Sequence, residues 1–168
     1  MRGGDNMKLL LIIDAQEGFM NEENRKITND IIEHVKNEEY NLIIATRFIN
    51  KIDSLYNKDS YRREITMLSS KAKLVEGIGE LADITIMKST YTALTTDLDK
   101  LLKKNEVKEV YLSGFNIESS IIATAFGLFD EDVKPIILSK LCGTMREDTF
   151  KQNALMILGN TIGKDNIL

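Results

Sequence analysis

The chain is poor in the residues that form disulfides, zinc clusters and phosphate-binding surfaces. Its 168 residues include one cysteine, Cys142, and one histidine, His34, which excludes an intramolecular disulfide and a zinc cluster of cysteine and histidine ligands. The formal net charge is −4, so there is no basic excess to hold nucleic acid by counterion release. No apolar run approaches the ~20 residues that a membrane span requires. We therefore expect a soluble protein with neither a nucleic-acid nor a membrane partner.

Length and composition indicate one domain. The 168 residues are 43% hydrophobic and 29% charged, which is typical of a soluble domain with a single core. The first six residues have no apolar stretch of the kind found in signal peptides. We expect residues 1–6 to be a disordered tail and 7–168 to form a single domain. The missing signal and the single cysteine together predict a cytoplasmic location.

Apolar blocks alternate with helix-period segments along the chain. The first block, residues 7–13, is almost purely aliphatic, as expected of a strand that is buried on both faces of a parallel sheet. Alternating strands and helices predict a parallel sheet with helices on both faces. The fold class is therefore α/β, a three-layer α/β/α sandwich with a mainly parallel sheet. The further strands are predicted at 41–47, 82–87, 108–113 and 133–138, and the helices at 29–36, 97–104, 119–129 and about 147–158.

Polar residues follow three of these strands. Asp14 ends the first strand, Lys88 ends the third, and the segment 116–120 follows the fourth. Ligands of parallel sheets bind outside the carboxyl ends of the strands, which share one edge. We therefore expect these residues to converge on one site, although Asp14 alone could equally cap the following turn.

The same residues resemble a known family. Asp14-Ala15-Gln16 with Phe19, then Lys88-Ser89-Thr90-Tyr91, then Gly114 followed by a turn and Thr124-Ala125, resemble the isochorismatase-like cysteine hydrolases, which include the nicotinamidases. The resemblance extends from Met7 nearly to the last residue. It implies a Rossmann-like fold and hydrolysis of a small-molecule amide, ester or vinyl ether. We also expect a homo-oligomer, a dimer or larger.

The resemblance assigns catalytic roles to Asp14, Lys88 and Ser120. The family has a nucleophilic cysteine where Ser120 stands, six residues after Gly114. A serine hydroxyl does not ionise as a thiol does and needs a base, which in this cluster is Asp14. Alternatively, Asp14 is a general acid in vinyl-ether hydrolysis, as thought for relatives that also lack the cysteine.

Three further residues are expected to bind substrate or its oxyanion: Phe19, Asn116 and Ser119. In this family the segment after the fourth strand can supply backbone N–H groups to an oxyanion, and the resemblance suggests a cis peptide bond nearby. Cys142, which follows the fifth predicted strand, is expected to be a small, partly buried apolar residue.

The metal ligands of nicotinamidases are missing. Those enzymes carry an Asp-x-His motif after the second strand, whereas this chain has Phe48-Ile49-Asn50. We therefore expect no metal and no cofactor, and nicotinamidase activity is disfavoured. The segment 50–54 and Tyr56 are expected to line the substrate mouth or a subunit contact, or to form a solvated loop. Two functions remain: a small-molecule hydrolase, or a catalytically weakened member of the family that keeps the pocket for ligand binding or assembly.

Overall fold

The computed structural model describes residues 7–168, so the predicted tail at 1–6 lies outside the described residues. A single parallel sheet has the strand order β3-β2-β1-β4-β5. Its strands are β1 (Leu9–Ile13), β2 (Leu42–Phe48), β3 (Ile84–Lys88), β4 (Glu109–Phe115) and β5 (Lys134–Gly143). The α-helices are α1 (Glu22–Asn37), α2 (Ile78–Leu81), α3 (Thr96–Lys104), α4 (Ile122–Asp130) and α5 (Asp148–Thr161).

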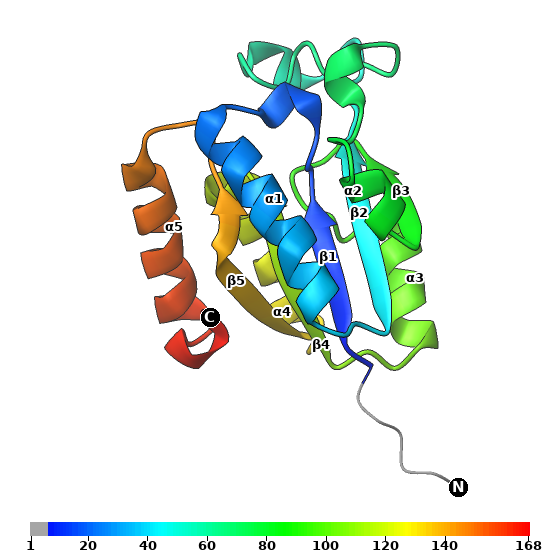
Figure 1. Cartoon of the computed structure of the whole chain (residues 1–168), viewed down its shortest axis with the longest axis vertical. Helices are drawn as coiled ribbons and strands as arrows, with labels where there is room; N and C mark the ends of the chain where they lie inside the picture. Colours follow the sequence, from blue (N-terminus) through cyan, green and yellow to red (C-terminus); the bar gives the residue numbers. More distant parts are fainter. Residues whose placement is uncertain (1–6) are drawn as a thin grey trace, which may run out of the picture.

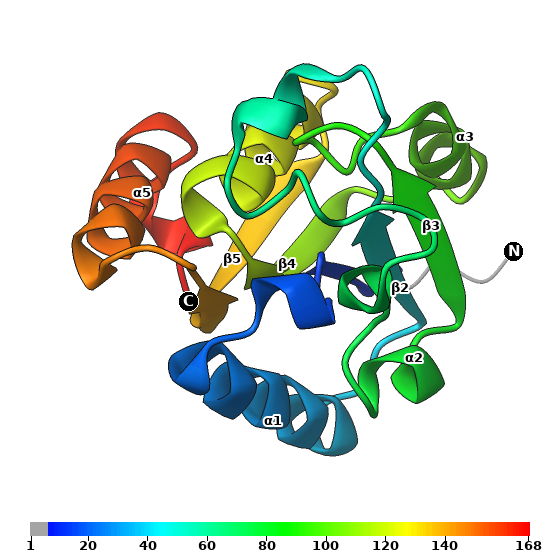
Figure 2. The same cartoon turned by 90° about the horizontal axis from the view of Figure 1, so that it is seen from above.

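Helices cover both faces of this sheet. Helices α1 and α2 lie on one face, and α3, α4 and α5 lie on the other (Figures 1 and 2). Two apolar clusters separate the layers: one joins β1 and β4 to α3, α4 and α5, and the other joins β1 and β2 to α1. All five residues of β1 are fully buried, with side chains in both clusters. The predicted three-layer α/β/α fold is therefore confirmed.

Two elements are longer than the sequence pattern predicts. Helix α1 begins at Glu22, seven residues before the predicted start, because Asn21 caps it by accepting a hydrogen bond from the Asn24 N–H (2.7 Å). Buried Asn24 and Thr28 lie on the inward face of this first part and interrupt its apolar periodicity. Strand β5 continues to Gly143, five residues past the predicted end.

The chain changes direction across the sheet between β1 and β4. From β1 it continues to β2 on one side, whereas β4 is followed by β5 on the other. Such a switch point opens a crevice at the carboxyl ends of the strands. Gly114 is paired with Ile13 in this register and has φ +114°, and a Cβ there would overlap the Ile13 backbone. Only glycine permits this close approach.

The segment between β2 and α2 lies over the carboxyl ends of β1 and β2 (Figure 1). It contains short 3₁₀ turns at Leu55–Lys58 and Ser70–Ala72. Buried Ile65 and Ala72 anchor it to the α1 side of the core. The Gln16 side chain also holds it, because its Nε2 donates to the carbonyls of Ala72 and Phe48. Among residues 7–168, no helix combines the length and apolar character needed to cross a membrane.

Candidate active site

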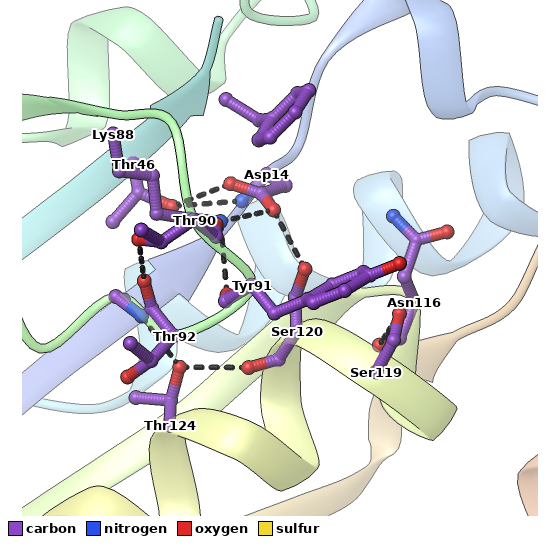
Figure 3. A network of polar contacts seen from close by, with 12 residues as sticks. Asp14, Thr46, Lys88, Thr90, Tyr91, Thr92, Asn116, Ser119, Ser120 and Thr124 are labelled. Atoms are coloured by element: carbon purple, nitrogen blue, oxygen red, sulfur yellow. Dashed lines mark hydrogen bonds and ion pairs between the residues drawn. The ribbon is translucent and has the colours of Figure 1, made fainter. Parts of the chain in front are cut away.

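Asp14, Lys88 and Ser120 meet at the switch point between β1 and β4 (Figure 3). The Lys88 Nζ lies 2.7 Å from Asp14 Oδ2, and the Ser120 Oγ donates to the same oxygen at 3.0 Å. Asp14 and Ser120 are fully buried, and Lys88 is 3% exposed. Residues separated by up to 106 positions therefore share one carboxylate.

The backbone at two chain reversals positions this cluster. Asp14 has φ 54° and Asn116 has φ 59°, a left-handed conformation that Asp and Asn adopt more readily than most residues. Asn116 begins a π-helical turn, Ile117–Ile121, that leads into α4. Such turns occur frequently at functional sites. The π turn carries Ser120, whose carbonyl accepts a hydrogen bond from the buried Thr124 hydroxyl (2.7 Å).

The Asp14 carboxylate accepts three side-chain hydrogen bonds. Besides Lys88 and Ser120, the Thr46 hydroxyl donates to Oδ1 at 2.8 Å, and it accepts from the Asp14 N–H at 3.1 Å. An ionised carboxylate is acceptor-only, and these three donors complement it. Thr46 lies near the end of β2 and was not predicted as a site residue, although its position near a strand end is the same signal that identified Lys88.

Lys88 is held as an ammonium by a complete set of acceptors. Its Nζ donates to Asp14 and to the carbonyls of Thr90 (2.9 Å) and Tyr91 (3.1 Å). Burial lowers the pKa of Lys88 below its ordinary value, Asp14 opposes this by charge and hydrogen bonding, and the charge of Arg62 lowers the pKa further. With three acceptors satisfied, Lys88 orients Asp14 and makes no hydrogen bond to Ser120.

Arg62 is a second site residue that the sequence did not predict. Its Nη2 donates to the hydroxyls of Ser120 (3.2 Å) and Ser119 (3.1 Å), and Nη1 forms an ion pair with Asp59 at 2.9 Å. The side chain is 3% exposed. Burial raises the pKa of Asp59, but hydrogen bonds from the Tyr61 N–H and from Arg62, with the charge of Arg62, outweigh it, so the net pKa is lowered.

Aromatic rings surround the Arg62 guanidinium. The centres of the Tyr91, Phe19 and Phe48 rings lie 4.7, 5.4 and 5.7 Å from its Cζ, within the range of cation–π attraction. The predicted residue Phe19 therefore reaches the cluster through Arg62. Outside lies an open depression of about 530 Å³ whose lining includes Tyr56, Asp59 and Tyr91.

The backbone N–H groups around Ser120 are engaged. Those of Ser119 and Ser120 donate to the Asn116 carbonyl at 3.0 and 2.8 Å, so these two amides are not free to bind an oxyanion. The cis peptide bond suggested by the family resemblance is absent from residues 7–168. The Asn116 side chain is buried, and its Nδ2 has no hydrogen-bond partner among the described residues.

Cys142 lies inside the core and away from the cluster. It is fully buried in β5, which goes beyond the partial burial expected from sequence. Its Sγ lies 3.2 Å from the Leu138 carbonyl oxygen. Burial raises the pKa of the Cys142 thiol to about 12, so a reactive thiolate is disfavoured.

The residues at the end of β2, where the sequence resemblance implies the metal site of nicotinamidases, do not fit a metal ion. Phe48 presents a buried aromatic ring that packs edge-on against Tyr56 at 5.1 Å between centroids. The Asn50 amide donates to Asn57 Oδ1 (2.7 Å) and to the Arg63 carbonyl (3.2 Å), and its Oδ1 accepts from Ser54. Zinc sites require histidine, cysteine or carboxylate ligands. Within residues 7–168, no three such side chains are grouped closely enough to hold a metal.

Comparison with known structures gives the same fold. The isochorismatase-like hydrolase from Alkaliphilus metalliredigens has 18% sequence identity and a TM-score of 0.78, over 91% of each chain. PnC1 from L. infantum in complex with nicotinate has 15% identity and a TM-score of 0.80, over 97% of this chain and 96% of that one. The pyrazinamidase of Pyrococcus horikoshii in complex with zinc has 24% identity and a TM-score of 0.76, over 96% and 98%.

Sequence comparison identifies the family. No curated protein sequence matches the chain. The isochorismatase domain model matches residues 8–163, which includes every strand and helix of the sheet sandwich and all three members of the buried cluster. The chain therefore belongs to the isochorismatase domain family.

Proposed function

We propose that this protein is a hydrolase of small amides or esters in which Ser120 is the nucleophile. The observation that carries the proposal is the 3.0 Å hydrogen bond from the Ser120 hydroxyl to Asp14, which is within the reach needed for proton transfer. Asp14 then serves as the general base, and Lys88 orients its carboxylate. The proposal includes the equivalence of Ser120 to the nucleophilic cysteine of the relatives.

The hydrogen bonds of Asp14 favour acyl transfer over vinyl-ether hydrolysis. A general acid must carry a proton, yet Asp14 already accepts hydrogen bonds from Lys88, Thr46 and Ser120. A carboxylate in this environment is suited to removing the Ser120 proton during attack on a carbonyl carbon. We therefore prefer an amide or ester substrate.

The relatives support a small planar substrate. The Pyrococcus horikoshii protein is a pyrazinamidase, and the L. infantum structure holds nicotinate. In this chain, the aromatic rings of Phe19, Phe48 and Tyr91 surround the guanidinium of Arg62, which donates to the Ser120 hydroxyl. Rings of this kind pack well against planar groups, so we propose small aromatic or otherwise planar acyl compounds as the substrate class.

A panel assay tests this function. Wild type, Ser120→Ala and Asp14→Asn are incubated with small aromatic amides, activated esters and vinyl ethers, and product formation is measured. We expect hydrolysis of amides or esters by the wild type and loss of it in both variants. Activity that survives in Ser120→Ala but not in Asp14→Asn, and only on vinyl ethers, would instead assign Asp14 as an acid.

The closed site favours one alternative, a catalytically weakened protein that binds a ligand or assembles. Asp14 and Ser120 are fully buried, and neither lines the open depression beside Asp59. If this reading holds, the wild type is inert across the panel and Asp14→Asn changes only ligand binding. Homo-oligomerisation and a cytoplasmic location stay predictions. The exposed apolar side chains of Ile52, Leu55 and Leu68 mark the surface where we expect subunits to meet.

Hydrolysis is expected to be insensitive to chelators. The proposed reaction uses Asp14, Lys88 and Ser120, and the side chains of Phe48 and Asn50 do not form a metal site. Rates on a substrate of the panel should be unchanged after incubation with a strong chelator and desalting. Complete loss that added divalent metal restores would contradict the proposed site.

A further inference from the structure

The cation that contacts Ser120 is Arg62, not Lys88. The three N–H groups of the Lys88 ammonium are directed to Asp14, Thr90 and Tyr91. Arg62 Nη2, in contrast, donates to Ser120 Oγ at 3.2 Å. Burial to 3% exposure removes the water that would otherwise screen this contact, which makes a buried positive charge effective at short range.

Few hydrogen-bond donors around Ser120 are free to bind a negatively charged substrate oxygen. The backbone N–H groups of Ser119 and Ser120 already donate to the Asn116 carbonyl. The Arg62 Nε–H and the Asn116 Nδ2, in contrast, are buried and have no partner among the described residues. A buried donor without an acceptor costs free energy in the resting protein, and that cost is removed when a ligand oxygen accepts from it.

We propose that Arg62 is a catalytic residue that binds the oxyanion formed when Ser120 attacks. This inference rests on the proposed function. In the first step the Ser120 Oγ bonds to the carbonyl carbon, the Ser120 proton passes to Asp14, and the π electron pair of the carbonyl moves to its oxygen. Arg62 then donates to that oxygen. On collapse, the bond to the leaving group breaks, the leaving group takes the proton from Asp14, and water hydrolyses the acyl-serine by the same steps.

The surroundings of Arg62 suit this role. Asp59 holds Nη1 through the 2.9 Å ion pair, so the guanidinium is fixed while Nε, together with Nη2 once it releases the Ser120 hydroxyl, donates to the substrate oxygen. Asp59 and Tyr91, which both contact Arg62, also line the open depression. An arginine offers several donors in one plane, so it can keep Asp59 and bind the oxyanion together.

The test uses p-nitrophenyl acetate, whose leaving group needs no proton and so isolates stabilisation of the oxyanion. The burst of p-nitrophenolate and the acetyl adduct on Ser120, measured by mass spectrometry, report acylation. We expect Arg62→Met to slow acylation about 100- to 1,000-fold, the usual cost of one oxyanion donor, and Arg62→Lys to slow it less. Arg63→Met is the matched control, because the neighbouring Arg63 side chain is 58% exposed, and its rate should equal that of wild type.

Two additions keep the test decisive. Circular dichroism shows whether each variant is folded. If Arg62→Met does not fold, the acylation rate of Arg62→Lys is compared with that of wild type instead. Millimolar guanidinium chloride, compared with equal sodium chloride, should restore part of the rate in Arg62→Ala, which a purely structural role would not produce.

The outcomes separate this inference from the function on which it rests. Acylation of Ser120 that is equal or faster in Arg62→Met would show that Arg62 only blocks the serine, which overturns the inference and leaves the hydrolase function standing. A wild type whose Ser120 is never acylated, with p-nitrophenolate release no faster than in Ser120→Ala, would overturn the proposed function and this role of Arg62 with it.

Discussion

Ser120→Cys is expected to turn over small amides or activated esters at least about tenfold faster than wild type. The thiolate is a stronger nucleophile than a serine hydroxyl. At position 120 the sulfur would lie beside the Arg62 guanidinium and near Lys88, in the π turn that leads into α4. Both positive charges favour ionisation of the thiol, whereas burial and the Asp14 carboxylate oppose it. A thiol is also much more acidic than a serine hydroxyl, so attack would depend less on proton removal by Asp14. The measurement is the rate on the amide and ester panel, with Ser120→Ala as the inactive reference.

A second measurement on the same variant reports the thiol directly. Alkylation by iodoacetamide as a function of pH should give the thiol introduced by Ser120→Cys a pKa below the ordinary value of about 8.5. Cys142 provides an internal control, because it is fully buried and burial raises the pKa of its thiol to about 12. A variant that is as inert as wild type, with an ordinary thiol pKa, would count against a site poised for catalysis and would favour the binding function.

Asp14→Asn is expected to lose stability as well as activity. The Lys88 and Asp14 side chains have no solvent exposure, and removal of one partner leaves the other as a buried, uncompensated charge. Such changes cost about 3–5 kcal/mol, a large share of the stability of a domain this size. Urea unfolding followed by circular dichroism should show the loss as a lower midpoint, while hydrolysis falls by about 100-fold or more because the base is missing.

The pH dependence and a double variant distinguish charge from packing. Burial already lowers the pKa of Lys88, and without Asp14 it should fall further. The folded variant then loses the Lys88 proton at a lower pH than the unfolded chain, so its free energy of unfolding should rise with pH up to the ordinary lysine value near 10.4. The double variant Asp14→Asn/Lys88→Met should lose less free energy of unfolding than the sum of the losses in the two single variants. Simple additivity would show that the ion pair contributes nothing.

The site residues that follow strand ends could be predicted from the sequence. Asp14 follows the fully buried strand β1, Lys88 ends the edge strand β3, and the parallel order of the strands brings both residues to one edge. The prediction of these strands depends on hydrophobic patterns that the sheet must bury. Ser120 was located by the family resemblance, in which the nucleophile comes six residues after the glycine that ends the fourth strand.

Arg62 could not be predicted in the same way. It lies in the segment between β2 and α2, which has no repeating apolar pattern, and its position depends on the Asp59 ion pair and on the turn that ends at buried Ile65. The first turns of α1 were missed for a related reason: Asn24 and Thr28 satisfy their polar groups with hydrogen bonds inside the fold, which the hydrophobic pattern does not reveal.

The close approach of β4 to β1 at Gly114 has a consequence for how mutations in this protein are interpreted. A side chain at Gly114 would press on the Ile13 backbone, and Ile13 directly precedes Asp14. The strand ends would separate, and the Asp14 carboxylate would move away from the Ser120 hydroxyl that donates to it. For the proposed hydrolase, a genetic screen for inactive protein would therefore recover substitutions at Gly114 as well as at Ser120, although residue 114 takes part in no step of the proposed reaction.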